Sequence, residues 1–219
     1  MKKFSLTVLF VLTAGLMYSQ SLYLNSGKNM TKYNFQTSNG ENAPKLVSGS
    51  GNYYELGYET PLFKESQMVK SLSYRGGVSL NQFNASGGDA ATQVAWKTNY
   101  LGLQNTLGYC FLQTNKVPGL KVFANLGLNL ATIIQGDQIV NNVYYNLANN
   151  NEFKGLFLQP SAGLDLRYNV SDVFDLNLKY NFSRAYNVTT TAAENLSFTN
   201  NQIALGISFP LYNSKAEQK

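Results

Sequence analysis

The 219-residue sequence contains no histidine and only one cysteine, Cys110. A single cysteine excludes an internal disulfide and a cysteine-based metal cluster. Without histidine the chain lacks the base that commonly activates a serine or a water molecule, so we expect no catalytic, cofactor or metal site. Charged residues make up only 13%, and the net charge of +5 falls to +3 without Lys2 and Lys3. Such a small, scattered excess does not predict nucleic-acid binding.

Long apolar runs are also missing beyond the N-terminal segment. There, Lys2 and Lys3 precede apolar residues 4–16, and a short polar stretch ends at Ser19 and Gln20. A basic start, an apolar stretch too short to span a bilayer and a cleavage zone are typical of a secretory signal peptide. No cysteine follows the run, so we expect no lipid anchor. We predict a signal peptide over residues 1–20, an exported domain over 21–212 and a polar tail over 213–219.

What the chain does contain are residues that favour strands and turns, with 15 tyrosines, 13 phenylalanines and 18 glycines. Apolar and polar residues alternate with a period of two, which indicates β-strands with two unlike faces. Seven segments alternate clearly: 54–62, 72–80, 101–111, 122–130, 156–168, 174–182 and 203–211. In an eighth, within 22–35, Leu22 and Leu24 set one phase. Thr31, Tyr33 and Phe35 set the other, so we predict a β-bulge between them.

The charged residues of the seven clear segments all fall on the polar face. An uncharged apolar face suits contact with lipid, because a charge at the bilayer midplane costs ~2–4 kcal/mol. The sequence therefore predicts an all-β fold, an eight-stranded antiparallel up-and-down transmembrane β-barrel. Side chains fill the interior of so small a barrel, and unpaired charges there are costly. We predict an ion-paired charge network in the lumen: Glu55, Glu59, Arg75, Asp165, Arg167, Asp175 and Lys179.

Aromatic residues and loop lengths indicate how the barrel lies in the membrane. Two aromatic girdles are expected at the two membrane interfaces. One would contain Tyr58, Tyr74, Tyr109, Phe111, Tyr168, Phe174, Phe209 and Tyr212, and the other Trp96, Tyr100, Tyr180 and Phe182. Segments 36–50, 84–94, 135–153 and 186–199 are long and polar, whereas 63–70, 112–119 and 169–172 are short. Long loops outside and short turns inside predict a protein of the cell outer membrane with both termini in the periplasm.

Part of the sequence resembles a known family. Residues 100–109 followed by 121–128 are similar to the central hairpin of PorT-like outer-membrane β-barrel domains, although Gly102 and Gln104 stand where the family usually has an acid and a proline. Segments 157–168 and 176–182 also look like the family's later strands. The resemblance implies an eight-stranded barrel and no particular chemistry. Some members resemble parts of a secretion apparatus, so envelope or secretion proteins are expected partners beside outer-membrane lipid and lipopolysaccharide.

These patterns favour a non-enzymatic barrel with a structural, surface-interaction or export-associated role. One alternative is a lipid-modifying enzyme with a histidine-free site, and another is a soluble, lipocalin-like lipid-binding barrel. Glu55 and Glu59 point the same way, as paired glycosidase carboxylates do, but pairing with lumen cations is the preferred interpretation. In loop 135–153, the apolar Val143, Tyr144 and Tyr145 are candidates for binding a partner or a glycan. Alternatively, they extend two strands above the membrane as a hairpin.

Overall fold

The computed structural model describes residues 21–36, 47–62, 72–88, 93–114, 118–150, 152–189 and 195–211. The predicted signal peptide and polar tail lie outside these residues, as does Tyr212. The described chain forms nine strands: β1 (Ser21–Gln36), β2 (Val47–Pro61), β3 (Leu72–Gly88), β4 (Gln93–Gln113), β5 (Gly119–Val140), β6 (Val143–Asn146), β7 (Leu156–Asn169), β8 (Asp175–Asn187) and β9 (Asn195–Pro210). No helix in this part of the chain is long and apolar enough to cross a membrane.

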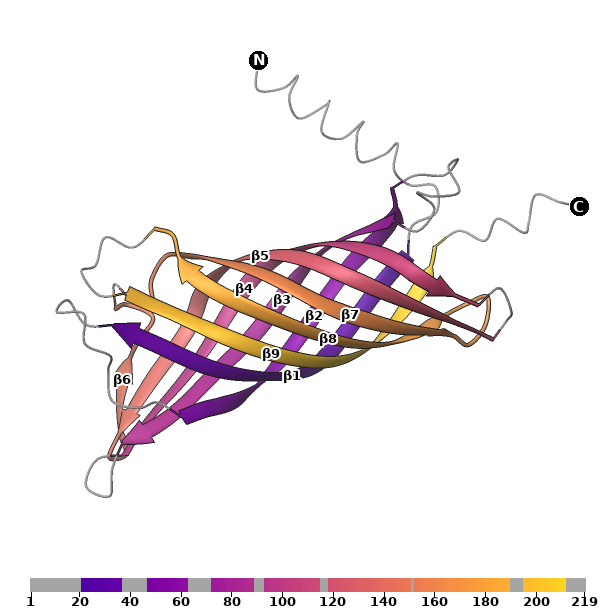
Figure 1. The fold of residues 1–219 in the computed structure, drawn as a ribbon. Helices are drawn as coiled ribbons and strands as arrows, with labels where there is room; N and C mark the ends of the chain where they lie inside the picture. Colours follow the sequence, from indigo (N-terminus) through magenta and orange to yellow (C-terminus); the bar gives the residue numbers. More distant parts are fainter. Residues whose placement is uncertain are drawn as a thin grey trace, which may run out of the picture.

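Eight of the strands close into a ring (Figure 1). Each of them pairs antiparallel with its neighbours in the order β1-β2-β3-β4-β5-β7-β8-β9, and β9 pairs with β1. The short strand β6 pairs with β5 alone among the described residues and stands outside the ring. This arrangement confirms the predicted eight-stranded up-and-down barrel.

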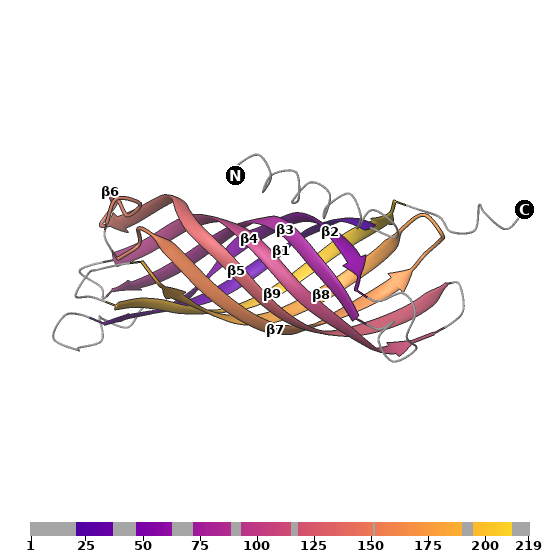
Figure 2. The same cartoon turned by 90° about the horizontal axis from the view of Figure 1, so that it is seen from above.

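The strands are strongly tilted around the barrel axis (Figure 2). Following the register partners once around the ring from Leu24 leads back to Asn34, ten residues further along β1. An eight-stranded barrel with such a stagger has an interior just wide enough to be filled by side chains. We call the end that contains β6 the hairpin end, and the opposite end, with the turn at 170–174, the turn end.

Most aliphatic residues in the middle of the strands point outward. Leu126, Leu205 and Leu103 are 69%, 67% and 59% exposed. The polar residues that alternate with such leucines along each strand face the lumen. A soluble lipocalin-like barrel has the reverse arrangement, with its apolar residues inside. An uncharged apolar band around the outside is instead the surface that a lipid bilayer requires.

Two details of the strands differ from prediction. β1 contains no bulge, because it pairs with β9 from Ser21 to Gln36 without a shift of register. Tyr33 points inward like Tyr23, so the apparent change of phase reflects an aromatic side chain packed inside the barrel. The strands at the hairpin end also run further than expected: only residues 89–92 separate β3 from β4, and β5 continues to Val140.

Six of the eight aromatic residues predicted for the turn-end girdle lie on the outer surface, whereas the girdle at the hairpin end is partly wrong. On the outer surface toward the turn end lie Tyr58, Tyr74, Tyr109, Phe111, Tyr168 and Phe209. Of the other two, Phe174 is half-buried just before β8 and Tyr212 lies outside the described residues. Toward the hairpin end, Tyr180 and Phe182 face outward as predicted, 45% and 48% exposed. Trp96 and Tyr100, assigned to the same girdle, are instead buried inside the barrel. Their phase on β4 is that of the lumen residues, and burial of aromatic surface against other rings holds them there.

Candidate functional site

The lumen near the turn end holds four charged side chains, which we call the ion cluster: Glu59, Arg75, Asp165 and Arg167. Arg75 Nε lies 2.7 Å from Glu59 Oε2, and Arg75 Nη1 lies 2.8 Å from Asp165 Oδ2. Arg167 makes the complementary contacts, with Nη1 2.7 Å from Glu59 Oε1 and Nε 2.9 Å from Asp165 Oδ2. Two acids and two bases from β2, β3 and β7 thus alternate in a ring of bonds, which offsets the cost of burying them.

Glu55 belongs to a separate group, which lies next to the ion cluster on the side toward the hairpin end. Its carboxylate accepts hydrogen bonds from Tyr23 Oη at 2.8 Å, from Asn25 Nδ2 at 3.0 Å and from the Tyr53 hydroxyl. Lys179 Nζ lies 3.4 Å away. The carboxylates of Glu55 and Glu59 are therefore each held by their own buried donors. Neither faces an open cleft of the kind a glycosidase needs for its substrate.

Six of the seven residues predicted for the lumen network thus lie together in these two groups. Asp175 does not join them. It is the first residue of β8, at the turn end, where its carboxylate accepts a hydrogen bond from Asn169 Nδ2 at 2.7 Å. Its position in the period-two pattern gives the correct face, but its distance along the strand places it at the rim.

Between these charged groups and the hairpin end lies a layer of amide and hydroxyl side chains. Its hydrogen bonds run from Asn129 Nδ2 to Gln159 Oε1 at 3.2 Å and from Gln159 Nε2 to Ser183 Oγ at 2.7 Å. On the adjacent strands β9 and β1, Gln202 Nε2 donates to Asn29 Oδ1 at 3.0 Å. The cavity left within this layer has a volume of only about 20 Å³, which is room for about one water molecule.

The lumen at the hairpin end is filled by an aromatic plug, which sequence reasoning missed. It consists of Tyr33, Phe83, Trp96, Tyr100, Phe157 and Phe198, covered by Leu147 and Phe153 from the segment between β6 and β7. Ring centroids lie as close as 4.6 Å for Phe83 and Phe198, and 5.2 Å for both Trp96–Phe153 and Tyr100–Phe157. A signal was present in the sequence, because Phe83 and Phe157 are each two residues from a lumen amide, Asn81 and Gln159.

The segment with Val143, Tyr144 and Tyr145 forms a hairpin that extends β5 beyond the barrel, which was the alternative prediction. Asn141 and Asn142 both have positive φ, 48° and 67°, as a two-residue type I′ turn requires. The three apolar side chains of β6 are 53%, 71% and 54% exposed. The hairpin is therefore compatible with both predictions, a binding loop and a strand extension. It prolongs β5, and the described chain leaves the apolar side chains of β6 uncovered.

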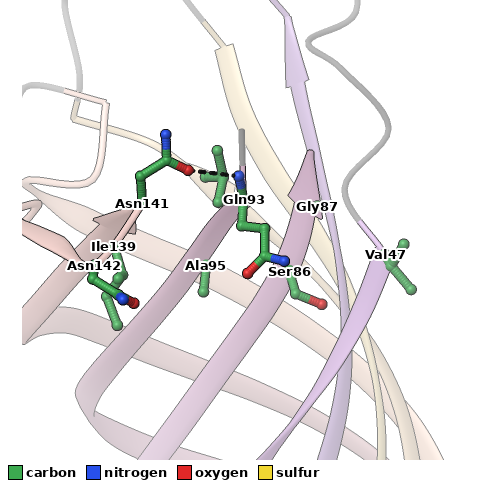
Figure 3. Close-up of a pocket in the computed structure, with 9 residues that line it drawn as sticks. Val47, Ser86, Gly87, Gln93, Ala95, Ile139, Asn141 and Asn142 are labelled. Atoms are coloured by element: carbon green, nitrogen blue, oxygen red, sulfur yellow. Dashed lines mark hydrogen bonds between the residues drawn. The ribbon is translucent and has the colours of Figure 1, made fainter. Parts of the chain in front are cut away.

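An open groove lies beside the turn of this hairpin (Figure 3). It has a volume of about 500 Å³ and is bounded by Ile139, Asn141 and Asn142 of the hairpin, by residues of β3 and β4, and by Val47 of β2. A hydrogen bond of 3.0 Å from the Gln93 backbone N–H to Asn141 Oδ1 ties the tip to β4. Among the residues described, no group of three histidine, cysteine or acidic side chains could hold a metal ion.

The ring of strands and its filled lumen define the class of the protein: a small up-and-down β-barrel of the kind known from bacterial outer membranes. No protein-family model and no curated protein matches the sequence. The resemblance to PorT-like domains therefore stays a prediction.

Solved structures match the fold. OprG of Pseudomonas aeruginosa matches with a TM-score of 0.52 at 10% identity, covering 89% of this chain and 97% of that one. Ail, the attachment invasion locus protein of Yersinia pestis, gives a TM-score of 0.43 at 10% identity over 88% and 100% of the two chains. Neisserial surface protein A gives 0.42 at 14% identity over 86% and 96%. At such identity, the likeness to OprG concerns the fold alone.

Proposed function

We propose that the chain is a non-enzymatic, integral protein of the bacterial outer membrane that acts through the surface it presents outside the cell. The observation that carries this proposal is the filled lumen. Ion cluster, amide layer and aromatic plug follow one another along the barrel, so side chains of the described residues fill its interior. What stays accessible is the hairpin end, which the proposal places outside the cell, with both termini in the periplasm.

The β5–β6 hairpin is the surface that we infer to contact a partner. Val143, Tyr144 and Tyr145 supply apolar and aromatic area of the kind that anchors protein interfaces. Within the described chain, β6 pairs with β5 on one side only. An edge strand of this kind can accept an extended segment of another protein by β-strand addition. A segment of an envelope or secretion protein fits both features.

Location and orientation can be tested by cysteine labelling of intact cells. In a Cys110→Ser background, a cysteine is placed at Tyr144 in the hairpin or at Val173 in the opposite turn, which are 71% and 66% exposed. We expect a membrane-impermeant maleimide to label Tyr144→Cys in intact cells, and Val173→Cys only after the outer membrane is permeabilised. Labelling in the reverse order would invert the orientation. Recovery of the chain in the soluble periplasm would end the proposal.

Ion conductance tests separately whether the lumen is closed. Planar-bilayer recordings of the purified chain should show no large, steady conductance, because the ion cluster and the aromatic plug close the interior at both ends. Reproducible porin-like steps would contradict the proposal. A histidine-free lipid-modifying enzyme would instead release fatty acid from outer-membrane lipid, and incubation of the folded chain with such lipid should release none.

A further inference from the structure

Three basic residues, which we call the basic face, lie on the outside of the barrel: Lys28 and Lys32 of β1 and Arg184 of β8. All three side chains are exposed, unlike the charges of the lumen. Arg184 is paired in register with Thr199 of β9, and Thr199 with Lys32, so one row of the sheet carries cations at both ends. Lys28 lies on the same side of β1, four residues nearer the turn end.

Lys32 and Arg184 lie where the outer surface changes from apolar to polar, and Lys28 is paired in register with Ile203, the last exposed apolar residue of β9 before this change. Along β9, exposed Leu205 and Ile203 are followed toward the hairpin end by Asn201 and Thr199. Along β8, the exposed rings of Tyr180 and Phe182 are followed by Arg184, whose guanidinium carbon lies 5.1 Å from the centroid of the Tyr186 ring. In a membrane protein this change marks the level of the lipid headgroups. Under the proposed orientation, these are headgroups of the outer leaflet.

Within the described ranges, the strands that carry these cations offer no outward acid to balance them. Among the described residues, β1, β8 and β9 carry no acid on their outer faces. The lysine ammonium of Lys28 donates a hydrogen bond of 2.7 Å to Asn52 Oδ1, which is neutral. Lys97 makes a useful contrast, because this outward lysine of β4 stands directly across from Asp137 of β5 in the sheet register. In the described part of β1, β8 and β9, the outward charges are therefore all positive.

The spacing of the basic face indicates the size of its ligand. Adjacent strands lie about 4.8 Å apart and residues rise about 3.3 Å along a strand. Arg184 and Lys32 are therefore about 10 Å apart along the row, and Lys28 and Lys32 about 13 Å apart along β1. A single phosphate cannot contact all three, whereas a disaccharide headgroup that carries phosphates at separate positions can.

We propose that the basic face binds the phosphate groups of a phosphorylated glycolipid in the outer leaflet, which is the chemistry of lipopolysaccharide. Arginine and lysine form charge-assisted hydrogen bonds with phosphate, and the apolar rows below them on β8 and β9 contact the acyl chains of the same lipid. Asn201 and Thr199, between the cations, supply neutral polar groups for sugar hydroxyls. The inference rests on the proposed outer-membrane location and names the lipid recognised there.

The test uses the full chain, folded into phosphatidylcholine vesicles with or without bis-phosphorylated lipid A. The readout is the equilibrium affinity of the folded chain for lipid A, with the heat-dependent gel shift recording folding. We expect the affinity to fall about fivefold for each cation removed by Lys28→Gln, Lys32→Gln or Arg184→Gln. Lys97→Gln is the matched control and should leave the affinity unchanged, because that lysine already faces an acid.

The outcomes separate the two proposals. If the triple variant of the basic face binds lipid A as the parent chain does, the inference is overturned. Equal affinity for dephosphorylated lipid A, or for phosphatidylglycerol, would overturn it as well, because the glycolipid phosphates would not be what is recognised. Absence of a gel shift in all of these vesicles would refute the proposal that the chain is a membrane barrel. Folding without a preference for lipid A would refute only the proposal that the basic face binds this lipid.

Discussion

An arginine placed at Leu126 tests the assignment of the two barrel faces. Leu126 is 69% exposed and lies on the outer face of β5, paired in register with Leu107 of β4 and Ala162 of β7. Because apolar residues surround it on the outer surface, we place it near the bilayer midplane, where an arginine costs ~2–4 kcal/mol. With a total stability on the order of 5–15 kcal/mol for a folded domain, the variant should fold but unfold at a clearly lower denaturant concentration.

Thr132 is the matched control, because it lies on the same face of the same strand, six residues nearer the hairpin end. At about 3.3 Å per residue this is roughly 20 Å along the tilted strand, close to the interface, where an arginine costs only ~0–1 kcal/mol. Unfolding from vesicles can be followed by the fluorescence of Trp96, the one tryptophan, which is buried in the aromatic plug. Equal losses for Leu126→Arg and Thr132→Arg, or a larger loss for Thr132→Arg, would refute the depth assignment.

Three further changes probe the lumen, the sheet and the hairpin by denaturant unfolding in the same vesicles. Asp165→Asn removes one acid from the ion cluster and should cost ~3–5 kcal/mol, since two buried arginines lose a charged acceptor; a loss below ~1 kcal/mol would show that the cluster is hydrated. Gly27→Ala should destabilise by ~1–3 kcal/mol because its Cβ would meet the backbone of Ile203 on β9, and an unchanged midpoint would contradict this packing. Tyr144→Ser should alter stability by less than ~0.5 kcal/mol, as an exposed hairpin residue does; a larger loss would mean that the ring packs against the barrel.

Much of the barrel could be predicted from the sequence because the membrane imposes a strict rule on one face of each strand. A charge on the lipid-facing side of a strand is costly, so the inward positions of Glu55 and Arg75 reveal the phase of β2 and β3. The choice of side chains in the lumen is less restricted, since both polar and aromatic side chains can fill it. The phase of Tyr33 was therefore misread as a bulge, and Trp96 was assigned to the lipid interface.

Positions along the barrel axis are harder to predict than faces. Asp175 has the phase of a lumen residue, but its height depends on where β8 begins, and the chain turns immediately before it. The alternation of Phe157 with Gln159 likewise does not indicate that one belongs to a plug and the other to an amide layer. Heights follow from the stagger between strands, which arises from the closure of the whole ring and leaves no local signal in the sequence.

The pairing of β1 with β9 also constrains how the molecule is made. This seam joins the first and last described strands over sixteen positions, from Ser21–Pro210 to Gln36–Asn195. Until it forms, both strands present open edges and the lumen charges remain in contact with water. Bringing together segments so distant in sequence is slow, so closure comes late in assembly. The chain therefore needs protection of two exposed edges until its last strand is in place, and a chain cut short before β9 would leave β1 open to pairing with another copy.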